Sequence, residues 1–113
     1  MAEHIKIRPA AGTWVVRAGG AVLGESTNAL ELSEGDLPPV IYFPRHDIAM
    51  EFLDTSERNS NCPHKGDAVY FSIVTKSTVL KDVAWSYEAP KDDVSEIAGY
   101  LAFYPDQVAV EKL

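Results

Sequence analysis

The segment Cys62–Gly66 has the sequence Cys-Pro-His-Lys-Gly and gathers a thiol, an imidazole and an amine in a few residues. Proline and glycine beside these groups are typical of a turn. Cys62 could act as a nucleophile if His64 or Lys65 stabilised its thiolate. The alternative is a small buried side chain, which is the usual role of a lone cysteine, and we favour that interpretation.

A zinc site can also be drawn from Cys62, His64, His46 and Asp67. Structural zinc sites usually take four ligands from paired Cys or Cys-His clusters, and this chain lacks such pairs. The adjacent acids Asp92 and Asp93 stand in a Pro-Lys loop, where carboxylates are usually solvated. We therefore expect a plain turn at the segment, with no metal site and no cofactor.

Lys65 and Asp82 are the two candidate catalytic residues. Lys65 precedes Gly66, but the full glycine-rich spacing of a phosphate-binding loop is missing. A lysine in a polar loop can still contact an anionic ligand, and the alternative is a solvated surface lysine. Asp82 has apolar neighbours, so its carboxylate needs a cation or a donor, or its pKa rises. It is a candidate general acid or base, although a structural ion pair is the favoured role.

Aromatic side chains near these groups could form the walls of a ligand site. Trp85, Tyr87 and Tyr100 could stack on a planar ligand, whereas ordinary packing within the sheet is the favoured role of strand aromatics. We predict a pocket that is walled by aromatic rings and ringed by charged side chains. The predicted ligand-binding residues are Tyr42, Arg45, Asp47, Lys65, Asp82, Trp85 and Tyr87.

The elements that must position these residues are predicted to be strands. Thr13–Ala18 and Ala21–Ser26 flank Gly19-Gly20, which predicts a hairpin with a two-residue turn. Apolar residues alternate with others from Val69 to Ile73, and a turn at Thr75–Thr78 leads into a strand over Val79–Tyr87. In that last strand, strict alternation would place Asp82 on the opposite face from Trp85.

Shorter elements complete the prediction. Strands are expected at Asn28–Leu32 and Val40–Phe43, and a half-buried strand at Ile48–Phe52. The polar, punctuated stretch from Asp54 to Gly66 predicts a long loop. One helical turn is expected at Val94–Ala98. The last two expected strands are Tyr100–Tyr104 and an edge run at Val108–Val110.

The fold class that follows is mainly β: one small antiparallel domain of two sheets, spanning residues 1–113, with at most one or two short helical turns. No stretch keeps a 3.6-residue apolar period over ten or more positions, so no long helix is expected. A length of 113 residues fits one domain.

Composition narrows the partners and the compartment. The formal charge of −7 repels phosphate backbones, so we expect no nucleic-acid binding. No apolar run is long enough to span a membrane, and Met1–Arg8 lacks the apolar core of a signal peptide. A single cysteine fits a reducing compartment, so a cytoplasmic protein is expected. The oligomeric state is left open.

Four strings of sequence together resemble a bacterial family known as domain-of-unknown-function family 427, sometimes labelled nucleotidyltransferase-like. The resemblance runs from about Trp14 to Val108. It implies a small β fold related to the β-tent group, in which two antiparallel sheets meet at an angle. The sequence does not support the transferase label, because it lacks a recognisable Gly-Ser loop followed by closely spaced aspartates. The strings are Tyr42–Ile48, Asn61–Gly66, Ala84–Tyr87 with Pro90, and Gly99–Pro105.

The function predicted from these observations is the binding of a small molecule, a nucleotide or another anionic ligand, with or without catalysis. The alternative is a non-enzymatic structural or protein-interaction module. In that case the aromatic residues Trp85 and Tyr87 would be packing residues or an exposed contact patch.

Overall fold

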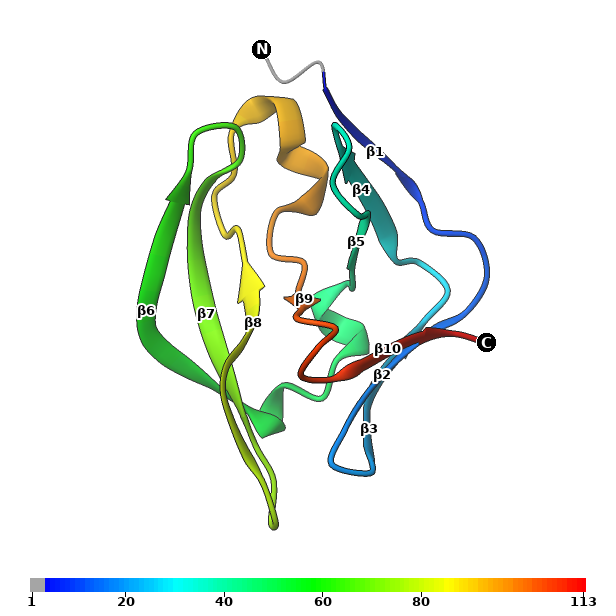
Figure 1. Cartoon of the computed structure of the whole chain (residues 1–113), viewed down its shortest axis with the longest axis vertical. Helices are drawn as coiled ribbons and strands as arrows, with labels where there is room; N and C mark the ends of the chain where they lie inside the picture. The colour runs from blue at the N-terminus through cyan, green and yellow to red at the C-terminus, as the bar shows by residue number, and fades with distance from the viewer. Residues whose placement is uncertain (1–3) are drawn as a thin grey trace.

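The alternating apolar residues in the middle of the sequence form the central strands of the largest sheet. The computed structural model describes residues 4–113, and its four-stranded sheet has the order β6-β7-β8-β9 with every pair antiparallel. These strands are β6 (Leu53–Cys62), β7 (Gly66–Val74), β8 (Val79–Ser86) and β9 (Ala102–Phe103). In Figure 1 the first three curve together along one side of the molecule, from green to yellow.

A second antiparallel sheet faces the first (Figure 1). It has the order β1-β4-β5, with β1 at Ile5–Pro9, β4 at Leu30–Glu34 and β5 at Val40–Tyr42. Just beyond β5, Phe43 exchanges both backbone hydrogen bonds with Leu101, at N···O distances of 2.7 and 2.9 Å. The two sheets are therefore tied together at the point where β5 ends and β9 begins.

The predicted Gly-Gly hairpin belongs to a third sheet, of order β10-β2-β3. It joins β2 (Trp14–Ala18) to β3 (Ala21–Ser26), and β10 (Ala109–Lys112) pairs with the outer edge of β2. Gly19 and Gly20 have φ values of 55° and 81°. Two successive left-handed residues match the type I′ turn that best suits the twist of a hairpin, and glycine adopts that backbone without strain.

Buried side chains form two clusters that fill the space between the sheets. One cluster lies under the third sheet and includes Val16, Leu23 and Phe43. The other lies between β4–β5 and β7–β8, and it includes Tyr42, Tyr70 and two side chains of η3 (Asp92–Ile97), Val94 and Ile97. The mainly β, antiparallel fold with only short 3₁₀ turns is confirmed, and its strands form three sheets where two were expected.

The predicted strand over Ile48–Phe52 is wrong. Two 3₁₀ turns occupy this region, η1 (Arg45–Asp47) and η2 (Met50–Phe52). Between them, Ile48 forms a β-bridge with Gly24 of β3, and Ala49 N donates to Leu23 O at 2.8 Å. Ile48 is still buried in the core, and the partly buried side chains of Met50 and Phe52 pack against it. Apolar residues two positions apart can be buried from successive tight turns, so the alternation alone did not require extended backbone.

The predicted loop from Asp54 to Gly66 is also wrong, because most of it is β6, a ten-residue strand. β6 is the edge strand of its sheet, and most of its side chains are exposed. Backbone pairing with β7 defines the strand, while polar side chains on an exposed edge strand leave no apolar alternation in the sequence. A register shift between Thr55 and Asn59 further disturbs the pattern.

Smaller differences concern element ends. β4 begins at Leu30 and continues through Glu34, whereas the predicted strand covered Asn28–Leu32. The aromatic strand near the C-terminus keeps only the two residues of β9. Within the described part of the chain, no helix has the length and apolar character needed to cross a membrane.

Candidate functional site

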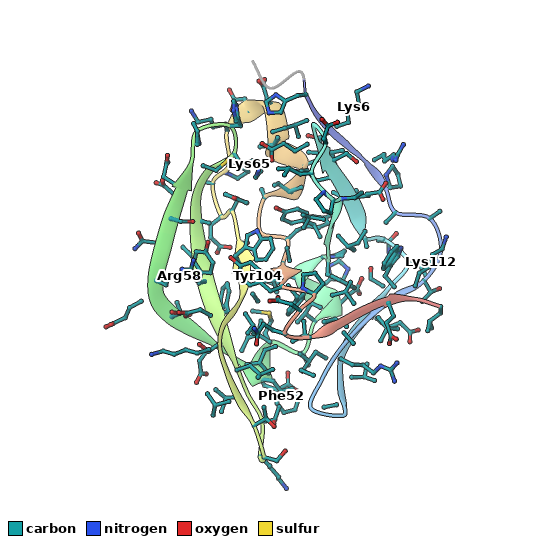
Figure 2. The ribbon with its side chains drawn as sticks, in the orientation of Figure 1. Lys6, Phe52, Arg58, Lys65, Tyr104 and Lys112 are labelled. Atoms are coloured by element: carbon teal, nitrogen blue, oxygen red, sulfur yellow. The ribbon has the colours of Figure 1, made fainter. Side chains whose placement is uncertain are left out.

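A cavity of about 260 Å³ lies between the facing sheets and is the candidate site. β4, β5 and the segment that joins them form one wall, while β7, β8 and the residue Tyr104 after β9 form the other. Lys65, in the turn between β6 and β7, closes one end. Figure 2 shows Lys65 and Tyr104 between the β6–β8 ribbons and β4.

Strand periodicity explains why these side chains share one cavity. Leu32 and Glu34 are two residues apart on β4, and Val40 and Tyr42 are two residues apart on β5, so each pair lies on one face of its strand. β4 and β5 are adjacent and antiparallel. Their inward faces therefore present a continuous surface, apolar along most of its length and acidic at the Glu34 end.

An ion pair occupies that acidic end. Lys65 Nζ donates a hydrogen bond to Glu34 Oε1 at 2.6 Å, and the two side chains are only 11% and 18% exposed. The turn that carries Lys65 is fixed by a hydrogen bond from Lys65 N to Cys62 O and by another from Lys91 N to Lys65 O. Since an ammonium has three N–H donors, Lys65 keeps donors for a second partner in the cavity.

The ion pair sets the charge of both groups. The hydrogen bond from Lys65 lowers the pKa of Glu34 against the opposing effect of burial, so the carboxylate is ionised at neutral pH. Burial lowers the pKa of Lys65, but the hydrogen bond to Glu34 and nearby negative groups outweigh it, and the net shift is upward. Lys65 is therefore an ammonium. In this form it can donate hydrogen bonds but cannot act as a base or nucleophile.

Four tyrosines also line the cavity: Tyr42, Tyr70, Tyr87 and Tyr104. The Tyr42 hydroxyl accepts a hydrogen bond from Trp85 Nε1 at 3.3 Å, and the Tyr70 hydroxyl lies 2.9 Å from Ser60 Oγ. Burial raises the pKa of Tyr42, Tyr87 and Tyr104 above the usual value for a tyrosine. These three hydroxyls stay protonated at neutral pH and can donate as well as accept hydrogen bonds.

Aromatic rings form the remaining surface. Trp85 packs against Tyr104 with ring centroids 4.6 Å apart and meets Tyr42 edge-on at 6.4 Å. The Arg58 guanidinium covers the Tyr70 ring, with Cζ 4.4 Å from its centroid. Arrangements of this kind fix the rings in place, because aromatic pairs favour offset or edge-to-face contact.

A larger apolar groove of about 610 Å³ shares part of its lining with the cavity. Five side chains border both spaces, among them Leu37, Pro38 and Trp85. Beyond them the groove passes Trp14 on β2 and Pro105 after β9. A ligand bound beside Lys65 therefore has an apolar surface along which it can extend.

The structure brings together four of the seven predicted ligand-binding residues, because Tyr42, Lys65, Trp85 and Tyr87 all line the smaller cavity. Tyr100, the third predicted stacking residue, packs against the core cluster beside the cavity and does not line it.

Arg45 lies outside the cavity, and its partners indicate a structural role. Its Nε donates to Gly99 O at 3.1 Å, and its guanidinium pairs with Glu88 and lies 5.5 Å from the Phe71 ring centroid. Ser86 Oγ, which is fully buried, also donates to Glu88 at 2.8 Å. The arginine thus joins the ends of β5, β8 and η3.

Asp47 and Asp82 also lie outside the cavity. Asp47 accepts a hydrogen bond from Ser26 Oγ at 2.6 Å, which fixes η1 against β3. Asp82 accepts from Ser56 Oγ on β6, and its φ of 55° places it in the left-handed region. A register shift in β7–β8 accompanies that residue. Asp82 does not line the cavity that Trp85 lines, which agrees with the opposite faces that alternation predicts for the two residues.

Three side chains with polar groups that line the cavity were missing from the sequence prediction: Glu34, Tyr70 and Tyr104. Tyr70 stands in the alternating run of β7, so its face could have been assigned. Nothing in the sequence indicates that Glu34 meets Lys65, because the contact depends on how two sheets face each other. The zinc set drawn from Cys62 is not gathered, and the described side chains that converge with metal-ligand spacing are instead His4, Glu34 and His64.

A comparison with known families matches the chain to a family model. The model of a family described as a domain of unknown function (DUF427) matches residues 6–112. None of the curated proteins compared with the chain matches it.

Proposed function

We propose that this chain, which belongs to the family described as a domain of unknown function (DUF427), binds a small molecule in the cavity between β4–β5 and β7–β8. The ligand class is a flat, ring-containing molecule with one anionic or hydrogen-bond-accepting group. The observation that carries the proposal is the convergence of the Lys65–Glu34 pair and four tyrosines on one otherwise apolar cavity. A concave apolar site with a few converging polar groups is the usual form of a ligand pocket.

Charge at the closed end favours a weakly charged ligand. Lys65 is the cationic group that lines the cavity, and Glu34 already balances it. A carboxylate or a single phosphate could share the ammonium, whereas a triphosphate would bring more negative charge than this end can neutralise. The overall charge of −7 acts in the same direction.

The aromatic surface favours a ring at the other end of the ligand. Trp85 and Tyr104 border both the cavity and the groove, so a planar group can lie against them while its polar group reaches Lys65. A volume of about 260 Å³ accommodates one ring system, and a nucleoside monophosphate would also occupy part of the groove. The tyrosine hydroxyls supply orientation through hydrogen bonds.

Tryptophan fluorescence offers a direct test. Trp14→Phe leaves Trp85 as the only tryptophan, since the chain has two. A panel of aromatic carboxylates, nucleosides and nucleoside monophosphates should yield a compound that changes Trp85 emission and raises the melting temperature. Lys65→Met should weaken binding of an anionic hit by at least about tenfold, while Lys6→Met on exposed β1 should leave it unchanged. No hit in the panel, or hits insensitive to Lys65→Met, would contradict the proposal.

A protein-interaction module is the second candidate, and the apolar groove beside Trp14 and Pro105 favours it. Exposed apolar surface of this kind also suits protein contacts. Light scattering together with pull-down from a lysate distinguishes the two candidates. A monomer that captures no protein yet binds a compound beside Trp85 supports the small-molecule proposal.

A further inference from the structure

Three side chains from distant parts of the sequence converge at the edge of the second sheet. His4, Glu34 and His64 each offer one nitrogen or oxygen ligand atom, and these atoms all lie within 4.8 Å of one another. His4 Nε2 is 3.4 Å from Glu34 Oε2, and the His4 and His64 rings meet edge-on with centroids 4.6 Å apart. Two imidazoles and one carboxylate form a ligand set used by zinc sites that keep an open coordination position.

The backbone holds this cluster in place. Ile5 pairs with Glu34 in the β1–β4 ladder, and Gly35 N donates to His4 O at 3.0 Å, so His4 is fixed beside the end of β4. His64 lies in the tight turn between β6 and β7, whose ends are joined by the pairing of Cys62 with Gly66. The arrangement is therefore a consequence of sheet pairing and does not depend on long loops.

The distances suit a small divalent cation. A tetrahedral ion with bonds of about 2.1 Å to nitrogen and oxygen separates its ligand atoms by about 3.4 Å. The His4–Glu34 separation already has that value. The wider separations within the cluster can close by rotation of the imidazoles, because both histidines are exposed at the surface.

Lys65 gives the cluster an outer partner. It binds Glu34 Oε1, while Oε2 faces His4, so the carboxylate can hold an ion through one oxygen and keep Lys65 on the other. Hydrogen bonds to the second oxygen orient metal-binding carboxylates in this way. The same glutamate is thus shared by the cluster and the cavity.

We propose that His4, Glu34 and His64 bind one divalent transition-metal ion, with Zn²⁺ as the favoured ion and with one coordination position open. The sequence led us to expect no metal site, because it suggested only a ligand set around Cys62. The three ligands found here are separated by about 30 residues each in the chain, which is why spacing rules for zinc motifs do not reveal them.

Cobalt substitution tests the site without any cavity ligand, so its outcome is independent of the proposed small-molecule function. The full chain, freed of any affinity tag and treated with a chelator, is titrated with Co²⁺ and followed by visible absorbance, and Zn²⁺ is then added as a competitor. We expect one Co²⁺ per chain, a four- or five-coordinate spectrum, and displacement by Zn²⁺. Loss of an outer-shell partner typically weakens metal binding by about 10–100-fold, so loss of a ligand in His4→Ala or His64→Ala should weaken it by at least about 100-fold.

Two controls complete the test. His46→Ala removes an exposed histidine that lies beside Asp47 and outside the cluster, and it should leave the affinity unchanged. Cys62→Ser should also leave the spectrum unchanged. Circular dichroism shows whether each variant is folded. Binding that survives both His4→Ala and His64→Ala, binding that disappears in His46→Ala or Cys62→Ser, or no stoichiometric Co²⁺ binding by the wild-type chain would overturn the proposal.

Discussion

Lys65 and Glu34 form an ion pair, with Nζ 2.6 Å from Oε1, that joins two different sheets. Lys65 belongs to the turn between β6 and β7, while Glu34 is the last residue of β4. The pair therefore ties the two walls of the cavity at one end. At the opposite end, the backbone bonds between Phe43 and Leu101 tie the same two sheets.

The first prediction concerns the stability that this pair supplies. Lys65→Met keeps most of the apolar stem but leaves the Glu34 carboxylate largely buried without its cation. Loss of one partner should lower the free energy of unfolding by about 1–3 kcal/mol at neutral pH. Lys6→Met, at an exposed position of β1, is the matched control and should change it by less than about 0.5 kcal/mol. Urea denaturation in the presence of a chelator measures both, and equal effects would refute the role of the pair.

The second prediction is the pH dependence of the same pair. Because Lys65 lowers the pKa of Glu34 in the folded chain, the stabilisation is present above the unfolded value of 4.5 and is lost as pH falls through the folded value. The gap in unfolding free energy between wild type and Lys65→Met should therefore narrow from about pH 7 to about pH 3. Urea denaturation across this range measures the gap. A gap that stays constant or widens on acidification would show that the ion pair with Glu34 does not account for the stabilisation by Lys65.

The sequence predicted elements whose side chains alternate and missed those that backbone pairing alone defines. β7 and the β2–β3 hairpin were recognisable because each has a buried face or a distinctive turn. β6 was not, because an edge strand needs no apolar face. The segment Ile48–Phe52 resembles a strand in sequence because its apolar residues Ile48, Met50 and Phe52 fall two positions apart, although Met50–Phe52 is a 3₁₀ turn.

The candidate site was predictable only within single strands. Trp85 and Tyr87 could be placed together because they lie two residues apart in the predicted strand Val79–Tyr87. The contact of Lys65 with Glu34 required knowledge of which sheets face each other, and no local pattern encodes that. Asp82 was included in the predicted site although alternation placed it on the opposite face from Trp85, and it does not line the cavity.

The third prediction concerns the buried hydroxyl of Tyr42, which is 1% exposed and accepts from Trp85 Nε1. Tyr42→Phe should cost about 1 kcal/mol near pH 8 through the lost hydrogen bond. Burial raises the folded pKa of Tyr42 above its unfolded value of 10.0, so in the wild type its contribution falls as pH rises past that unfolded value. The variant lacks this loss. The difference in unfolding free energy between wild type and Tyr42→Phe should therefore be smaller at about pH 10.5 than at about pH 8. Urea denaturation at the two pH values measures it, and a difference that grows with pH would contradict the assignment.

The fourth prediction separates structure from binding at Asp82. Its φ of 55° disfavours most side chains but is tolerated by Asn, and its carboxylate accepts from Ser56. Asp82→Val should destabilise the chain by about 2–3 kcal/mol through strain and the lost acceptor, whereas Asp82→Asn should cost less than about 1 kcal/mol. Asp82→Asn should also leave the affinity for a cavity ligand unchanged. A large loss of ligand affinity in this stable variant would show that Asp82 contributes to binding in the cavity.

The fifth prediction compares Gly24 in β3 with Gly20 in the turn between β2 and β3. The two glycines are needed for different reasons. A Cβ on Gly24 would lie 2.5 Å from Asp47 O and from Ile48 Cδ1, so space is the constraint there. Gly20 has φ +81°, and a Cβ added to it would meet no atom within 4 Å, so backbone conformation is the constraint. Gly24→Ala should cost about 2–3 kcal/mol and Gly24→Asn more, because a larger side chain pushes η1 further from β3.

At Gly20 the order should reverse, because Asn adopts the left-handed region more readily than Ala. Gly20→Ala should cost about 1 kcal/mol and Gly20→Asn less than about 0.5 kcal/mol. Thermal and urea denaturation of the four variants test the two rankings together. The absence of a side chain on Gly24 lets the backbone of Asp47 approach β3 closely. A Gly24→Asn variant as stable as Gly24→Ala would therefore mean that space is not the constraint at this position.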